Sequence, residues 1–179
     1  DNVFIDQQSE IQYIQSLAYN NSPLTTESHH VVKDVAILMT DAMVDNIVIC
    51  ENDQPIGTME KIEAHEKALL HRAFSVFIIN QKGEIMLQQR AWHKYHSPLL
   101  WTNTCCSHQR VGETNLEAGK RRLQEEMGFE VSLKELFHFI YKAPFDNGLT
   151  EHELDHVMIC YYNEEPNINP EEVESWKWM

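Results

Sequence analysis

A single segment, residues 113–129, carries signals for both the start and the end of a helix. Thr114 and Glu117 have the spacing of a capping box, in which each side chain accepts a hydrogen bond from the backbone N–H of the other residue. Gly128 suits the left-handed conformation that ends a helix after Met127. The sequence therefore predicts one helix that is delimited at both ends.

Most of the surrounding sequence is typical of strands and turns rather than of further helices. β-Branched and aromatic residues recur in short runs, and Ile85 and Leu87 lie two residues apart, as on one face of a strand. Many strands with one clear helix among them indicate an α+β domain. Strands are predicted at 45–50, 71–79, 84–90, 136–143, 155–163 and 174–179, with turns at 51–57 and 80–83.

Residues 1–42 differ in character from the rest of the chain. Ile11, Ile14, Leu17 and Ala18 recur at helical spacing before the NNSPLTTES segment breaks the pattern. We expect a helical N-terminal extension that packs on the main domain or on a partner, followed by one domain over residues 43–179. Because the chain does not begin with methionine, we interpret it as a fragment or a processed form.

Charge and cysteine content restrict the class of function. Lys and Arg total 14 against 28 Asp and Glu, a formal charge of −14, which argues against general nucleic-acid binding. An anionic ligand would need local positive charges or metal ions. No run reaches the roughly 18 to 20 apolar residues of a membrane span, and four cysteines are too few for a disulfide framework. We expect free thiols, a cytoplasmic location and no nucleic-acid or membrane partner; we favour a monomer and leave the oligomeric state open.

The predicted helix carries two charged pairs. Arg121 and Glu125, and likewise Arg122 and Glu126, are four residues apart and so face one another on the helix surface. An exposed salt-bridged helix is one interpretation of this pattern. A site for a charged ligand is the other.

The string TNTCCSH, residues 102–108, places two cysteines next to a histidine. A thiol near histidines and carboxylates can serve as an acid–base catalyst when its pKa is tuned. The alternative, a small buried apolar residue, is the interpretation we keep for Cys50 and Cys160 in their apolar runs.

Three histidines and two carboxylates predict a divalent-metal site. Glu151 and Glu153 lie two residues apart in a strand-like segment, so both side chains project from one face. Imidazoles and carboxylates together form a mixed nitrogen and oxygen ligand set for a divalent ion. The imidazoles are those of His65, His71 and His108, and a core or surface position is the alternative for each of them alone.

The spacing in residues 113–129 resembles the Nudix box, a loop and helix that hold Mg²⁺ beside a diphosphate in that family. Ser107 stands where the first glycine of the box belongs, and Arg122 replaces its first helical glutamate. The lost carboxylate weakens the case for Nudix hydrolysis, whereas an arginine suits a diphosphate oxygen. The matching residues are Glu113, Arg121, Leu123, Glu125, Glu126, Gly128 and Phe129.

A wider set of strings resembles type I isopentenyl-diphosphate delta-isomerase, in the same order, over residues 43–179. The strings are MEKIEAHEKALLHRAFSVF, LQQR, WTNTCCSH, the altered Nudix box, YKA and EHELDH. The resemblance implies Nudix-like mixed β-sheets packed with helices. It also implies an enzyme of isoprenoid biosynthesis that interconverts isopentenyl and dimethylallyl diphosphate by moving a double bond and a proton.

The resemblance implies a role for each matching residue. Cys106 matches the catalytic thiol, Glu153 the second acid–base group, and Tyr141 the tyrosine that assists it; we expect Glu153 and Tyr141 to act as the acid and the Cys106 thiolate as the base. Ligands of a Zn²⁺, Mn²⁺ or Mg²⁺ ion are expected at His65, His71, His108, Glu151 and Glu153, and Glu126 is expected beside the Mg²⁺ of the diphosphate. Cationic diphosphate contacts are expected at Lys61, Arg90, Lys94 and Arg122, with Trp101 offering a π face to a carbocation.

Family members continue for some tens of residues beyond the position of Met179, so we expect the C-terminal part of the domain to be missing here. The alternatives are a Nudix-type diphosphate hydrolase, a catalytically dead diphosphate- or metal-binding domain, and a thiol hydrolase.

Overall fold

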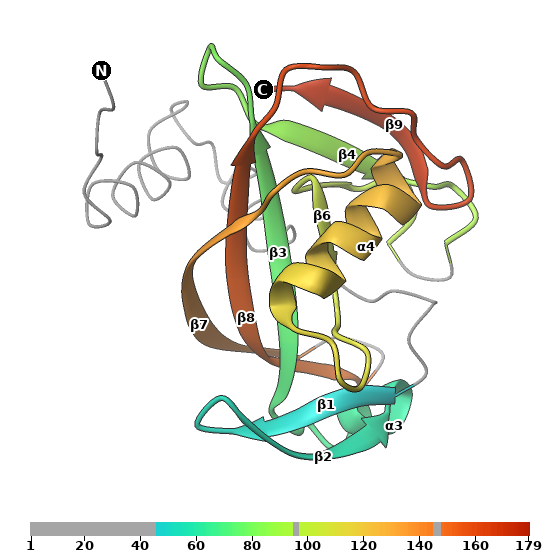
Figure 1. Ribbon diagram of the computed structural model, residues 1–179. Helices are drawn as coiled ribbons and strands as arrows, with labels where there is room; N and C mark the ends of the chain where they lie inside the picture. The colour runs from blue at the N-terminus through green and yellow to red at the C-terminus, as the bar shows by residue number, and fades with distance from the viewer. Residues whose placement is uncertain (1–45, 95–96, 145–147) are drawn as a thin grey trace, which may run out of the picture.

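A computed structural model of the chain describes residues 46–94, 97–144 and 148–179 (Figure 1). The predicted helical extension at residues 1–42, and its boundary with the main domain, lie outside the described residues. Among the described residues, no helix is both long enough and apolar enough to cross a lipid bilayer.

The larger of two sheets has the strand order β2–β1–β3–β8–β7, and β6 also pairs with β3. β3 and β8 run parallel, and the other pairs in this sheet are antiparallel. β1, β2 and the short helix α3 gather at the beginning of β3 (Figure 1). The strands are β1 (Asn46–Glu51), β2 (Gln54–Glu60), β3 (His71–Ile79), β6 (Cys105–Ser107), β7 (Lys134–Pro144) and β8 (Thr150–Tyr161), and α3 is Lys61–Glu66.

The two faces of this sheet have different chemistry, because successive side chains of a strand point to opposite sides. On β3, Phe74, Val76 and Ile78 point to one face and belong to the apolar core. His71 and Ser75 point to the other face, where His71 is in register with Glu153 and Ser75 with Cys106. We call the first the core face and the second the polar face.

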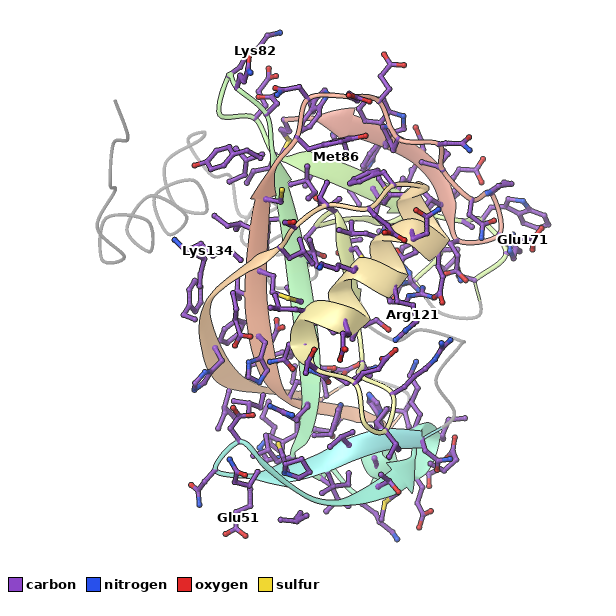
Figure 2. All side chains as sticks on the ribbon, in the orientation of Figure 1. Glu51, Lys82, Met86, Arg121, Lys134 and Glu171 are labelled. Carbon is purple, nitrogen blue, oxygen red and sulfur yellow. The ribbon has the colours of Figure 1, made fainter. Side chains whose placement is uncertain are left out.

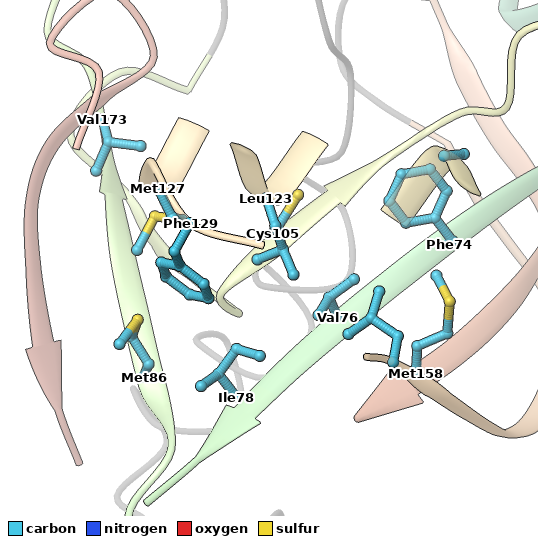
Figure 3. Packing of buried hydrophobic residues seen from close by; sticks show 12 residues of the cluster. Phe74, Val76, Ile78, Met86, Cys105, Leu123, Met127, Phe129, Met158 and Val173 are labelled. Atoms are coloured by element: carbon cyan, nitrogen blue, oxygen red, sulfur yellow. The ribbon is translucent and has the colours of Figure 1, made fainter. Parts of the chain in front are cut away.

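The helix α4 (Asn115–Met127) covers the core face (Figure 1). Figure 3 shows Leu123 and Met127 of α4 beside Val76 and Ile78, with Met158 of β8 in the same cluster. The predicted caps are confirmed: Thr114 and Glu117 form a reciprocal capping box, and Gly128 is left-handed with φ 75°.

A smaller sheet has the order β5–β4–β9, with β4 (Met86–Arg90) between β5 (Trp101–Thr102) and β9 (Val173–Trp178). β4 carries Met86 into the core and Gln88 and Arg90 to a cavity described below. Charged residues of the turns and strand ends, among them Lys82 and Glu171, point outward (Figure 2).

Most predicted strands are confirmed, and three features differ. The turn predicted at 51–57 is too long, because β2 already begins at Gln54. β8 begins at Thr150, before the predicted 155, because its polar residues are buried in the sheet and lack the apolar pattern that marks a strand. The short elements α3, β5 and β6 were not predicted; each has six residues or fewer, which is too short for a clear periodicity.

Gly128→Ala should destabilise the domain strongly. The left-handed backbone costs a non-glycine residue about 1–2 kcal/mol, and a Cβ at this position would also meet the backbone carbonyl of Asn167. We expect the free energy of unfolding, measured with denaturant, to fall by more than about 2 kcal/mol.

Gly112→Ala is the matched control, because Gly112 has φ 87° but nothing within 4 Å of the added Cβ. Gly112→Ala should lose only the part of the free energy of unfolding that comes from the left-handed backbone. Equal losses for the two variants would contradict the importance of the close approach of Asn167.

Candidate active site

Three imidazoles and a carboxylate meet on the polar face near the start of β3. One ligand-type atom from each of His65, His71, His108 and Glu153 lies within 4.8 Å of the others, and all four residues are buried. The ring centroids of His65 and His71 are 4.8 Å apart, and those of His71 and His108 are 5.1 Å apart. The convergence predicted for the three histidines is therefore present, with contributions from α3, β3, the segment after β6, and β8.

The hydrogen bonds of His65 and His71 leave lone pairs facing the centre of this cluster. His65 Nδ1 donates to Lys61 O at 2.6 Å, so its Nε2 lone pair faces Glu151 Oε2 at 3.0 Å. His71 Nδ1 donates to Leu69 O at 2.9 Å, so its Nε2 faces Glu153 Oε1 at 3.5 Å. Imidazole lone pairs opposite carboxylate oxygens require a proton or a metal cation between them.

The pKa values of His65 and His108 agree with imidazole lone pairs that face the centre of the cluster. Burial lowers the pKa of His65, and it lowers the pKa of His108 to about 4, so both rings are neutral at pH 7. Burial and the neighbouring charge of Glu153 raise the pKa of Glu151 well above its usual range.

Unpartnered buried atoms support a metal at the same place. His71 Nε2, His108 Nδ1 and Glu151 Oε1 are buried and lack a hydrogen-bond partner. Such groups are costly unless they gain a ligand. The donor set of three imidazoles and the Glu153 carboxylate, with Glu151 beside His65, therefore fits a divalent transition metal.

Glu153 is held from three sides. Its Oε1 lies 3.1 Å from His108 Nε2, and its Oε2 accepts the hydroxyl hydrogen bond of Tyr141 at 2.7 Å. Burial alone would raise the pKa of Glu153, but the hydrogen bond from His108 and the nearby His71 ring outweigh it, and the pKa lies well below its usual range. Burial and then the charge of Glu153 raise the pKa of Tyr141, which therefore stays a donor.

Three of the four predicted cationic contacts, Arg90, Lys94 and Arg122, line a cavity beside β6. The cavity contains about 290 Å³ of empty space, including some open solvent. It has three positive and two negative side chains in its lining, so its local charge is positive although the chain is acidic. The lining residues are Gln88, Arg90, Lys94, Thr102, Cys106, Arg122, Glu126 and Glu172.

Arg122 organises the acidic part of this cavity. Its guanidinium is 1% exposed and contacts Glu125 at 2.8 Å, Glu126 at 2.7 Å and Glu172 at 3.3 Å. Lys94 binds the same Glu172 at 2.6 Å. Both oxygens of Glu126 accept hydrogen bonds, one from Arg122 and the other from Gln88 at 2.5 Å. A Mg²⁺ ion at Glu126 would therefore have to share this carboxylate with donors that the chain already supplies.

The two adjacent thiols are separated by the alternation of β6. Cys105 belongs to the apolar core, next to Leu123 in Figure 3, and its Sγ lies 3.4 Å from Glu126 Oε1. Cys106 pairs in register with Ser75 and lines the cavity. Burial, followed by the charge of Glu126, raises the pKa of both thiols, and the nearby Arg90 opposes the shift at Cys106.

The cluster of three histidines and Glu153 lies next to the cavity. His108 follows Cys106 by two residues of extended chain, which corresponds to roughly 7 Å. The charges of Glu153 and Asp155 both act on the Cys106 thiol. Cys106 and Glu153 therefore border the same part of the polar face, from β6 and from β8.

Two predicted binding residues lie apart from the cavity lining. Lys61 is buried at the start of α3, where its charge acts on Glu151. The Trp101 ring has the Lys177 ammonium 4.3 Å from its centroid, so this side chain contacts a cation of β9.

Sequence reasoning missed Glu172 and Asp155. Asp155 follows Glu153 by two residues, so the same alternation that selected Glu151 and Glu153 could have found it. It is buried, accepts from Ser75 Oγ at 2.8 Å, and has its pKa raised to about 7 by burial and by the charge of Glu153. Glu172 has no local signal, because it reaches Arg122 from fifty residues away in sequence.

The sequence matches a family model described as NUDIX domain over residues 69–179. It is 50% identical over 133 residues to isopentenyl-diphosphate Delta-isomerase 2 of Photorhabdus laumondii, covering 74% of this chain and 75% of that one. The isopentenyl-diphosphate Delta-isomerase of Pectobacterium atrosepticum is also 50% identical over 133 residues, with 74% of each chain covered.

Solved structures agree in fold. The Deinococcus radiodurans protein DR0079 superposes with a TM-score of 0.60 at 21% identity, covering 75% of this chain and 82% of that one. A MutT protein from Methanosarcina mazei gives a TM-score of 0.52 at 16% identity, covering 61% of this chain and 75% of that one.

Arg122→Gln should cost about 3–5 kcal/mol of the free energy of unfolding, because it leaves buried carboxylates without their cation. Denaturant unfolding measures this loss. Mg²⁺ should restore part of it in the variant, since a divalent ion can neutralise Glu126 and Glu172.

Arg110→Gln is the control, because Arg110 is 45% exposed and approaches Glu125 only at 3.6 Å. Its effect should stay within about 0.5 kcal/mol. A similarly small effect at Arg122 would mean that its ion pairs do not hold the cavity together.

Proposed function

The chain belongs to the isopentenyl-diphosphate Delta-isomerases of the NUDIX superfamily, and we propose that Cys106 and Glu153 are the two groups that move protons in its reaction. The enzyme is an isomerase that interconverts isopentenyl diphosphate and dimethylallyl diphosphate by moving a carbon–carbon double bond. One proton is added to the terminal methylene carbon, and another is removed from the carbon next to the one that bears the diphosphate.

The observation that carries this proposal is the alternation of β6 and β8. It directs Cys106 and Glu153, but not Cys105, to the polar face. The reaction is reversible, so the group that donates a proton in one direction accepts one in the other. The two groups therefore need to hold one transferable proton between them. A protonated Cys106 with an ionised Glu153, the state that their pKa shifts favour, satisfies this as well as the reverse.

Tyr141 has a supporting role in this proposal. Its hydroxyl donates to Glu153 Oε2 and fixes the orientation of the carboxylate, leaving Oε1 to the histidine cluster. A divalent ion held by His65, His71, His108, Glu151 and Glu153 would supply positive charge that ties the acidity of Glu153 to the ion. Three imidazole donors favour Zn²⁺ over Mg²⁺ or Mn²⁺ at this position.

The diphosphate is proposed to bind in the cavity lined by Arg90, Lys94 and Arg122. Guanidinium groups make paired hydrogen bonds to phosphate oxygens, and Lys94 adds a compact charge. Glu126 would be the protein ligand of a Mg²⁺ ion that accompanies the diphosphate. Lys61 remains a proposed substrate contact through its charge at longer range. Trp101 remains one through the π face of its ring. A monomeric state, a cytoplasmic location and the absence of nucleic-acid and membrane partners remain predictions.

Solvent exchange tests the proposed roles. In D₂O with Mg²⁺ and Zn²⁺, the protein should introduce deuterium into isopentenyl diphosphate without releasing phosphate. Cys106→Ala should lower the exchange rate about 10²–10⁴-fold, the usual contribution of a positioned acid–base group.

Cys105→Ala is the matched control, since the neighbouring thiol points into the core. It should keep the exchange rate within about threefold, although it removes buried volume and lowers stability. Equal losses in both variants would contradict the choice of Cys106. Phosphate release without label uptake would instead indicate a Nudix-type hydrolase, and binding with neither activity a dead domain.

A further inference from the structure

We propose that Glu135, His138 and His156 form a second binding site for a divalent transition-metal ion such as Zn²⁺. These residues lie on the core face, away from the proton-transfer groups. One ligand-type atom from each lies within 4.8 Å of the others, the same proximity as in the catalytic cluster. The site is independent of the reaction proposed above.

Strand register brings the two histidines together. His138 of β7 and His156 of β8 are direct cross-strand partners, so their side chains project from the same face. Their ring centroids are 5.3 Å apart. His156 is buried, whereas His138 is open to solvent and gives an ion a path of entry.

A β-bulge adds the carboxylate. Phe137 pairs with Val157, but Glu135, two residues earlier, pairs with Met158, only one residue further along β8. Regular pairing would have kept Glu135 on the polar face with Phe137. The bulge turns it to the face of His156, as bulges commonly do where a side chain is re-aimed.

The donor atoms are close to a coordinating geometry. Glu135 Oε1 lies 2.7 Å from His156 Nδ1. Zinc binds imidazole nitrogen and carboxylate oxygen at about 2.0–2.2 Å, so a tetrahedral site needs its donors roughly 3.3 Å apart. The three ligand-type atoms lie within 4.8 Å of one another, and rotamer changes at the exposed Glu135 and His138 would bring them to this spacing. Two imidazoles and one carboxylate leave one position for water.

Surrounding side chains form hydrogen bonds with the proposed ligands, as they do in known metal sites. His156 Nε2 donates to Asp53 Oδ1 at 3.2 Å, and Asp53 is itself fixed by Arg72 at 2.7 Å. A ligating histidine characteristically donates its second N–H to a carboxylate in this way. Asn115 donates to the other oxygen of Glu135 at 3.2 Å.

A bound ion takes the place of a proton. Both nitrogens of His156 lie next to carboxylate oxygens, and either nitrogen donates to its carboxylate when it carries a proton. When Zn²⁺ binds, the Nδ1 proton leaves to solvent and the Nδ1 lone pair forms the bond to zinc. The Nε2–H stays on the ring and continues to donate its hydrogen bond to Asp53. The competing explanation is that this network is only an internal ion pair.

The test compares zinc stoichiometry between full-length variants. Metal-stripped protein is equilibrated with Zn²⁺ by dialysis, and the bound zinc per chain is measured. His138→Gln should bind one Zn²⁺ fewer than the parent chain and should keep its isomerase rate, because the catalytic histidines are untouched. Glu135→Gln should weaken the same ion at least tenfold in competition with a chromophoric chelator.

His93→Gln is the matched control. His93 also contacts a glutamate, Glu171, at 3.4 Å, but it belongs to no cluster of ligand-type side chains among the described residues. It should bind as much zinc as the parent chain. Equal zinc in His138→Gln and the parent, or loss of an ion in His93→Gln, would overturn the proposal and leave an internal ion pair.

Discussion

The parallel pairing of β3 with β8 places His71 beside Glu153 where neither reaches water, and much of the surrounding structure compensates for that burial. A buried carboxylate is costly unless it is paired and hydrogen-bonded. Here α3 supplies His65, the segment after β6 supplies His108, and β7 supplies Tyr141. Each of these elements is anchored by a polar contact at one point on the sheet. The residues proposed to act in the reaction are thus the same ones that fix the geometry of the site.

The helix that defines the Nudix superfamily has a changed electrostatic role in this chain. Carboxylates near its C-terminal end face Arg122, a guanidinium supplied by the same helix. An internal cation neutralises Glu126 and Glu172 permanently, whereas a metal ion does so only when bound. The cavity lining also contains Arg90 and Lys94, and the proposed proton-transfer group Glu153 lies on a different element, β8. A shared fold can therefore serve an isomerase as well as hydrolases, because the chemistry depends on individual side chains.

Features specified by short stretches of sequence could be predicted, and those that depend on distant partners could not. Thr114, Glu117 and Gly128 fix the ends of α4 from within one segment, so the helix was predicted correctly. The alternation that joins Glu151 to Glu153 is equally local. In contrast, the contact of Glu172 with Arg122 and the place of Lys61 beside Glu151 depend on how separate elements pack. The resemblance to a known family supplied the proposed roles of Cys106 and Tyr141, which spacing alone did not.

The bulge in β7 shows why the two faces of one strand pair can hold unrelated groups. On the regular side of the bulge, Tyr141 is the cross-strand partner of Glu153 and shares its face. Beyond the bulge, Glu135 faces His156 instead. One extra residue in β7 thus reverses which residues point toward the core face, without disturbing β8. Residues 137–144 keep one continuous register with β8, so His138 and Tyr141 are placed by the same ladder and only Glu135 lies beyond the bulge. Only the Glu135 position can therefore change without shifting the register that pairs Tyr141 with Glu153.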